Sequence, residues 1–217
     1  MRAGLFDGLA QRLALNGAII LAAAIIVTFL IRRAFAGWYN ARDKFLEEES
    51  KANSARRREV EPEFFYTPRL DFLPLRDNAE GEIEKRQNQV RKCAESTMVH
   101  FPKKMTNLEL KTAYGVANLE KVTGYEENYN RYILSLVEWA EALLKNGDTE
   151  DAVRILEKAV ELGSEFRKTY LHLADYYTGQ SNADGLNYLL DKAALVFTDE
   201  GIKRQLMQYI MDKKESL

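Results

Sequence analysis

The segment AEALLKNGDTEDAVRILEKA, residues 140–159, returns 34 residues later as ADYYTGQSNADGLNYLLDKA, residues 174–193. Both segments lie within the stretch from Leu136 to Ala193. The recurring positions carry small residues, apolar residues or turn formers. They are Ala140 and Ala174, Leu143 and Tyr177, Gly147 and Ser181, Ala152 and Leu186, Leu156 and Leu190, and Ala159 and Ala193. A period of this length, with small residues at fixed places, predicts paired helices that stack closely on one another.

This pattern resembles the tetratricopeptide repeat. The resemblance covers about 65 residues, from Ile133 to Phe197, and departs from the family pattern at two places. Trp139 stands one residue before the small Ala140, and Ser164 occupies a position where proline is usual. The resemblance implies an all-α fold built from helical hairpins. Because two repeats alone rarely bury enough core to be stable, we expect further helices on both sides.

The expected helical domain covers residues 79–217 and makes a hairpin array of about six to seven helices. Gly124 is expected to end one of them. The last helix is expected to close the array as a cap, with Met207 and Met211 facing inward. The expected helices cover residues 78–101, 106–122, 126–145, 149–162, 165–177, 182–196 and 202–213.

An apolar run from Leu13 to Ile31 contains 19 residues without a charge. At a rise of about 1.5 Å per residue, a helix of this length nearly matches the hydrocarbon core of a bilayer. The run predicts a single transmembrane anchor over residues 13–33, with the lipid bilayer as its partner. A cleaved signal peptide is the alternative, since Ala34-Phe35-Ala36 has the small-x-small form of a cleavage site. Arg32 and Arg33 favour the anchor, because positive charge there stops transfer.

The flanks of this run predict its orientation. A short N-terminal segment, residues 1–12, precedes it, and most of the positive charge follows it. By the positive-inside rule, the protein is a single-pass cell-membrane protein with its N-terminus outside and its C-terminal domain in the cytoplasm. Trp38 and Tyr39 fall where an interfacial aromatic belt is expected. An organellar inner membrane is the alternative, because the N-terminus contains arginine and is nearly free of acid.

Two segments connect the anchor to the helical domain. Residues 34–61 are expected to form a charged juxtamembrane helix, in which Arg56-Arg57-Arg58 either belongs to a solvated stalk or attracts anionic lipid headgroups. Residues 62–78 contain three prolines and many aromatic residues, which predicts an extended segment. Its apolar side chains predict packing against the following domain or docking onto a partner, since a flexible linker would be polar.

Composition excludes several function classes. The net charge of −2 gives no electrostatic case for nucleic acid. Cys93 is the single cysteine, so no internal disulfide is possible, and we expect it to behave as a small apolar residue. His100 and His172 are far apart and form no zinc motif. With no nucleophile signature and no glycine-rich phosphate loop, the sequence predicts a protein without catalytic activity, metal or cofactor.

The resemblance implies a concave groove lined by the first helix of each repeat. Its expected residues are Leu134, Val137, Glu138, Glu141 and Lys145 from the first repeat, and Lys168, Leu171, His172 and Asp175 from the second. Some family members hold an acidic C-terminus with Lys and Asn at four positions that here carry neither residue. Those four are Val137, Glu141, Leu171 and Asp175. The acidic groove residues instead predict a partner segment of mixed basic and apolar character.

These features predict a membrane-anchored protein-interaction module that works as an adaptor or scaffold. The partner is a protein or peptide. An alternative is a structural or assembly subunit of a membrane complex that self-associates as a homo-oligomer.

Overall fold

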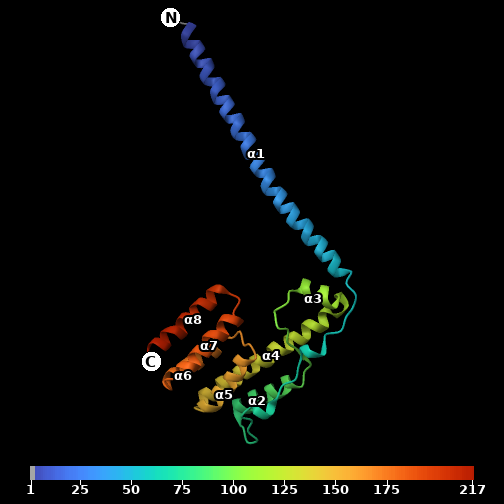
Figure 1. Cartoon of the computed structure of the whole chain (residues 1–217), viewed down its shortest axis with the longest axis vertical. Helices are drawn as coiled ribbons and strands as arrows, with labels where there is room; N and C mark the ends of the chain where they lie inside the picture. Colours follow the sequence, from blue (N-terminus) through green and yellow to red (C-terminus); the bar gives the residue numbers. More distant parts are fainter. Residues whose placement is uncertain (1–2) are drawn as a thin grey trace. The chain divides into compact units, whose positions relative to one another are not determined.

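A computed structural model describes the backbone of residues 3–217 and the side chains of residues 20–35, 38 and 40–217 (Figure 1). This part of the chain is about 75% helical and contains two strands of two residues each, so the all-α prediction is confirmed. The helices are α1 (Ala3–Asn53), α2 (Gly81–Ala94), α3 (Asn107–Tyr114), α4 (Val116–Asn146), α5 (Thr149–Glu161), α6 (Arg167–Gly179), α7 (Ala183–Val196) and α8 (Glu200–Glu215).

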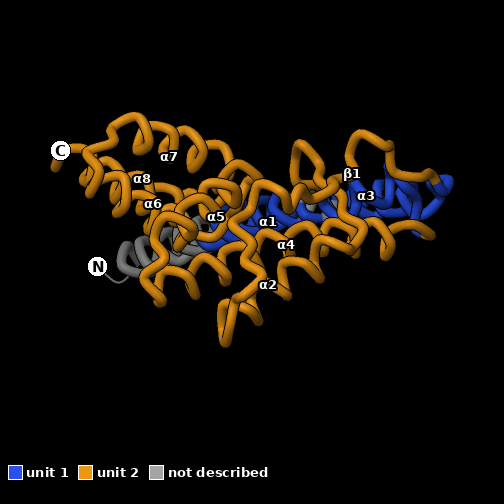
Figure 2. Tube along the Cα trace, turned by 90° about the horizontal axis from the view of Figure 1, so that it is seen from below, with its two compact units in different colours: residues 1–57, 106–116 blue, residues 58–105, 117–217 orange. Residues whose placement is uncertain are grey.

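The chain divides into two compact units (Figure 2). One contains α1 and α3, with residues up to Arg57 and Thr106–Val116. The other contains Arg58–Met105 and Ala117–Leu217. The predictions about the side chains of residues 1–12, of the first part of the anchor (13–19), and of Ala36 and Tyr39 lie outside the described residues.

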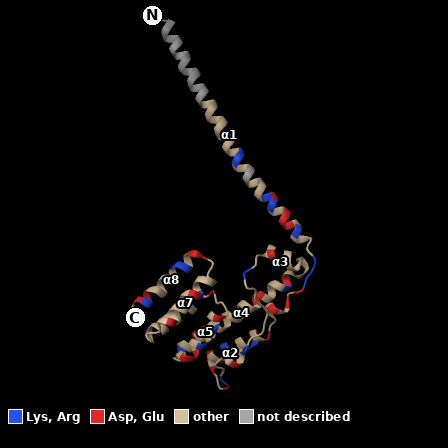
Figure 3. Ribbon diagram, in the orientation of Figure 1, with Lys and Arg blue, Asp and Glu red and all other residues tan. Residues whose placement is uncertain are grey.

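In the first unit, α1 is one continuous helix of 51 residues. The described part of its apolar run carries no charged side chain (Figure 3). Within the described residues, one helical segment, Ile20–Asn53, is long and apolar enough to cross a membrane, and its apolar window is unburied. A signal sequence near the N-terminus can have the same length and composition.

The end of α1 corrects the predicted charged helix over residues 34–61. Helix α1 stops at Asn53, and residues 55–61 are not helical. Its last turns are fixed by tertiary contacts with α3, because Ala52 is fully buried and Glu49 accepts a hydrogen bond from Lys111 Nζ at 2.5 Å. After the helix, the carbonyl of Arg58 accepts a hydrogen bond from the side-chain amide of Asn118, and such a tertiary contact overrides local helical preference.

Gly115 separates α3 from α4. Its φ of +79° lies in the left-handed region that favours glycine, and a Cβ there would lie 2.9 Å from the carbonyl oxygen of Arg56. Thr106 caps the start of α3 through a capping box with Glu109. The sequence predicts the helix break at Gly124, which is wrong. Gly124 lies inside α4 with no atom within 4 Å of its Cβ position, so nothing there requires a turn.

In the second unit, a short antiparallel pair joins β1 (Phe65–Tyr66) to β2 (Met98–Val99). The sequence predicts a helix through Phe101, but α2 ends at Ala94. Both residues of β2 are buried, and this strand, paired with β1, lies within the last seven residues of the predicted helix.

The segment from Pro62 to Leu75 packs mainly within the chain. It contains two short 3₁₀ turns, Pro62–Phe64 and Leu70–Phe72. Leu73 is buried, and the Tyr66 ring packs edge-to-face on Tyr129 with 5.2 Å between centroids. Phe65 and Phe72 are the exceptions, with 41% and 63% of their surface exposed.

Arg76 fastens the end of this segment to the helical array. Its backbone N–H and carbonyl bond to the side-chain amide of Gln87 on α2 at 2.9 and 2.8 Å. Its guanidinium group donates to Asp148 at 3.1 Å and to Asp151 at 2.7 Å at the start of α5. The extended segment is therefore held at its end by charge-assisted hydrogen bonds.

The two similar segments of the sequence have the same local geometry. Gly147 follows the end of α4, and Ser181 follows the end of α6. Both have positive φ angles, of 88° and 52° respectively. Each turn closes with the same six-residue backbone hydrogen bond. These bonds run from Asp148 N–H to Leu143 O at 3.0 Å and from Asn182 N–H to Tyr177 O at 2.8 Å. The recurring small residues are all fully buried; they are Ala140, Ala159, Ala174 and Ala193.

The boundaries of α5 to α8 lie within about two residues of the prediction. Helix α8 contacts both α6 and α7. Its buried residues are Leu206 and Ile210, and Met207 packs at the edge of the core. Met211 is 39% exposed, so the predicted inward orientation is wrong for this residue. The face of α8 that packs on the core is instead the one that carries Leu206 and Ile210.

Candidate interaction groove

A groove of about 710 Å³ lies between α4, α6 and α8, and we call it the α4–α8 groove. It brings together six of the nine residues predicted to line a binding surface. Its lining consists of Glu141, Leu144 and Lys145 from α4, Arg167, Lys168, Leu171, His172 and Asp175 from α6, and Tyr209 from α8.

Helical spacing places these residues on shared faces. On α6, the steps from Lys168 to Leu171, His172 and Asp175 are three, four and seven residues, so all four side chains lie on one side. Tyr177 belongs to the buried core on another face of the same helix. Leu144 and Arg167, which the prediction omits, obey the same spacing from Glu141 and Leu171.

Three groove residues occupy the same position of the sequence period. Glu141, Asp175 and Tyr209 are separated by 34 residues each and come from α4, α6 and α8. The prediction omits Tyr209, although extending the 34-residue period by one step finds it. Successive helices therefore bring equivalent positions to one surface.

Ion pairs cross the groove. Lys168 Nζ on α6 lies 3.1 Å from the Glu141 carboxylate on α4. Asp175 lies 2.7 Å from Lys213 Nζ and accepts a hydrogen bond from the Tyr209 hydroxyl at 2.6 Å. Partial burial would raise the pKa of Asp175, but the bonds from Lys213 and Tyr209 outweigh it and hold that pKa below its usual value. Asp175 is therefore held as an ion that already has partners.

The structure corrects the prediction for the other three residues. Val137 is 3% exposed and belongs to the core rather than to a groove. Leu134 and Glu138 line a separate cavity of about 170 Å³ beside α2. There Arg86 of α2 donates to Glu138 at 2.5 Å. The sequence does not reveal that α2 packs along this part of α4, so the predicted single groove is divided.

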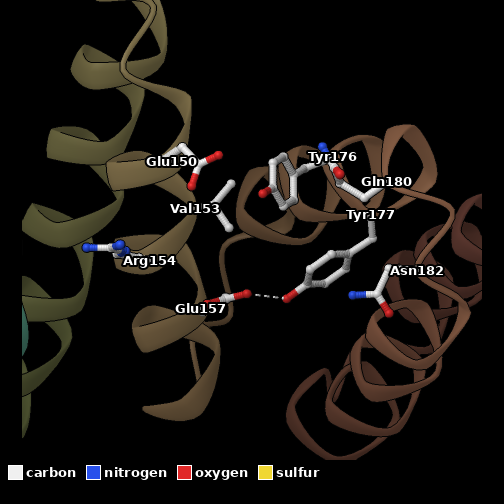
Figure 4. A pocket seen from close by; sticks show the side chains of 8 residues that line it. All are labelled: Glu150, Val153, Arg154, Glu157, Tyr176, Tyr177, Gln180 and Asn182. Atoms are coloured by element: carbon white, nitrogen blue, oxygen red, sulfur yellow. Dashed lines mark hydrogen bonds between the residues drawn. The ribbon is translucent and has the colours of Figure 1, made fainter.

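A second cavity, of about 580 Å³, lies beside α5 and the end of α6 (Figure 4). The Tyr177 hydroxyl donates to Glu157 at 2.6 Å across it. Burial, together with the Glu157 carboxylate, raises the pKa of Tyr177 above its ordinary value. Tyr177 thus remains a neutral hydrogen-bond donor in this polar cavity.

The remaining candidates for a chemical role are the cysteine and possible metal ligands. Cys93 is buried in the core, where its sulfur accepts a hydrogen bond from Gln89 at 3.3 Å. In the part of the chain that the structure describes, no three His, Cys, Asp or Glu residues are grouped to hold a metal ion. No family model matches the sequence, and neither the curated proteins nor the solved structures contain a match. The groove geometry is therefore the basis for a functional proposal.

Proposed function

We propose that this chain is a membrane-anchored interaction protein whose helical array, of the tetratricopeptide type, binds a segment of a partner protein in the α4–α8 groove. The observation that carries the proposal is the 34-residue spacing of Glu141, Asp175 and Tyr209 along one groove. Stacked repeats use equivalent positions in this way to build an extended binding surface. The half-buried Leu144 and Leu171 add apolar area to the charged lining.

The anchor in this proposal is the apolar run within residues 13–33, with the C-terminal helices on the cytoplasmic side. Its support is the length and composition of the N-terminal helix and the positive charge that follows. We expect a C-terminally tagged chain to stay in membranes after alkaline carbonate extraction. The tag should be digested by protease added from the cytoplasmic side of sealed vesicles. Release of the chain by carbonate, or protection of the tag, would contradict the anchor or its orientation respectively.

Site-directed photo-crosslinking in intact cells tests the groove. A benzoylphenylalanine residue in place of His172 reports on the groove, and the same residue in place of exposed Arg154 on α5 is the matched control. We expect a discrete crosslinked protein from position 172 that is absent from position 154. Equal labelling from both positions would overturn the assignment of this groove as the binding surface.

The alternative is a structural or assembly subunit that self-associates. Its support is a stripe of exposed aromatic residues on α1, formed by Phe35, Trp38 and Phe45. Their spacing of three and seven residues places them on one side of the helix. Two differently tagged copies expressed together separate the proposals. Recovery of one tag with the other, lost when Phe35 and Phe45 become Ser, supports self-association.

A further inference from the structure

The two carboxylates of the α4–α8 groove already have cationic partners. Glu141 pairs with Lys168, and Asp175 pairs with Lys213 while also accepting from Tyr209. A basic segment entering the groove would have to compete with Lys168 and Lys213 for these carboxylates. Both lysines would remain nearby as like charges, which disfavours that partner.

Two groove cations have no such partner. Among the described residues, no carboxylate oxygen lies within 4.0 Å of Lys145 Nζ or of the Arg167 guanidinium. Both side chains are exposed. Lys145 does contribute, as a minor cause at longer range, to the lowered pKa of Glu82. The lining thus carries three Lys or Arg residues and two carboxylates, in a chain whose net charge is −2.

We propose that the groove binds an acidic protein segment that also carries apolar residues. Its carboxylates would meet Lys145 and Arg167, and its apolar side chains would cover Leu144 and Leu171. This polarity is opposite to the one that the acidic residues of the sequence predict. The inference rests on the proposed function, because it specifies the partner of the same groove.

Selection from a random peptide library tests the charge of the partner directly. Twelve-residue peptides displayed on phage are selected on the full-length chain in nanodiscs. Each round is counter-selected on empty nanodiscs, and the selected peptides are then measured on the double variant Lys145→Glu, Arg167→Glu. A second full-length variant, Arg91→Glu with Arg154→Glu, carries the same change of net charge at exposed positions outside the groove. Circular dichroism and thermal unfolding establish that both variants are folded.

We expect the selected peptides to be enriched in Asp and Glu next to apolar residues. Binding of a selected peptide should weaken on the order of tenfold in the groove variant and by less than about twofold in the control variant. It should also weaken as salt rises, since these charges are exposed. Enrichment of basic or uncharged peptides would overturn the inference and leave the proposed groove intact. Peptides that bind both variants as well as the native chain, or no enrichment at all, would overturn the proposed function itself.

Discussion

In the first repeat, α4 carries Leu143 and the start of α5 carries Asp151. In the second repeat, the equivalent positions are Tyr177 and Gly185. A Cβ at Gly185 would lie 2.7 Å from Cδ2 of the Tyr177 ring, so the larger aromatic residue requires the missing side chain. The two repeats keep the same turn and the same buried alanines. They differ at this pair of positions, where the space taken by the Tyr177 ring is matched by the absence of a side chain at Gly185.

The comparison shows which features of the repeat are fixed by the backbone and which are adjustable. Close approach of two helices requires small residues at the crossing points, and these recur. Elsewhere a change on one helix is accommodated by a change on its neighbour. Burial also differs, because Leu156 is fully buried in the first repeat and Leu190 is only half-buried in the second.

The largest effect is expected from truncating these two leucines. Leu156→Ala should lower the free energy of unfolding by about 3 kcal/mol, because it removes a fully buried side chain and leaves a cavity. Leu190→Ala should cost roughly half as much, since part of that side chain is already in water. Urea unfolding of the full-length chain in detergent, followed by Trp139 fluorescence in a Trp38→Phe background, measures both. Equal losses would contradict the difference in packing between the repeats.

The packing of Tyr177 against Gly185 is tested by whether the effect of Gly185→Ala on the free energy of unfolding changes sign when Tyr177 is replaced. Gly185→Ala should destabilise by roughly 1 kcal/mol, because overpacking of about 1–3 kcal/mol exceeds the gain in helix propensity of about 1 kcal/mol. In a Tyr177→Leu background, which copies Leu143, the same substitution should stabilise by roughly 0.5–1 kcal/mol.

Gly124→Ala is the control for this cycle. Its Cβ meets no atom within 4 Å, so helix propensity should stabilise α4 with or without Tyr177. Additive effects of Gly185→Ala and Tyr177→Leu in the same unfolding assay would show that the two positions are not coupled.

The turn residues should respond in opposite directions. Gly147→Ala forces a Cβ into a backbone with φ of +88° and should cost about 1 kcal/mol. Ser181→Gly relieves a left-handed serine and should gain from a few tenths to about 1 kcal/mol. Thermal unfolding monitored by circular dichroism gives the order of the melting temperatures. A loss of stability in Ser181→Gly would mean that serine side-chain contacts outweigh the backbone strain.

The smallest effect concerns pH at the first turn, where Asp148 has Asn182 as its counterpart. The hydrogen bond from Arg76, with a smaller one from Asn146, holds the pKa of Asp148 below its unfolded value. Its contribution is therefore present above the unfolded pKa of about 3.9 and is lost as pH falls through the folded pKa.

Asp148→Asn copies the second repeat and removes this titration. The stability difference between the native chain and the variant should be present at pH 7 and should disappear toward pH 2. Arg76→Gln in the native chain should shrink the same pH dependence. A difference that stays constant from pH 7 to pH 2 in urea unfolding would show that Asp148 acts as a cap rather than as a paired ion.

Much of the helical array follows from the sequence. Turn formers, capping residues and apolar spacing predict the boundaries of α5 to α8 to within about two residues. The resemblance to the tetratricopeptide repeat implies six of the residues that line the groove. Sequence patterns do not tell which of two nearby glycines ends a helix. Gly115, with a φ of +79° and the carbonyl oxygen of Arg56 2.9 Å from its Cβ position, separates two helices, whereas Gly124 lies inside one.

The sequence by itself therefore determines the repeat, the apolar N-terminal run and the helical faces, because each depends on residues close together in the chain. The tertiary structure decides which of those faces remain exposed and which groove charges have no ion-pair partner. Packing of α2 removes Glu138 from the groove through Arg86. Pairing across α4, α6 and α8 neutralises Glu141 and Asp175. These outcomes depend on contacts between distant segments, and the lining that results carries three Lys or Arg residues and two carboxylates instead of the acidic excess of the predicted groove residues.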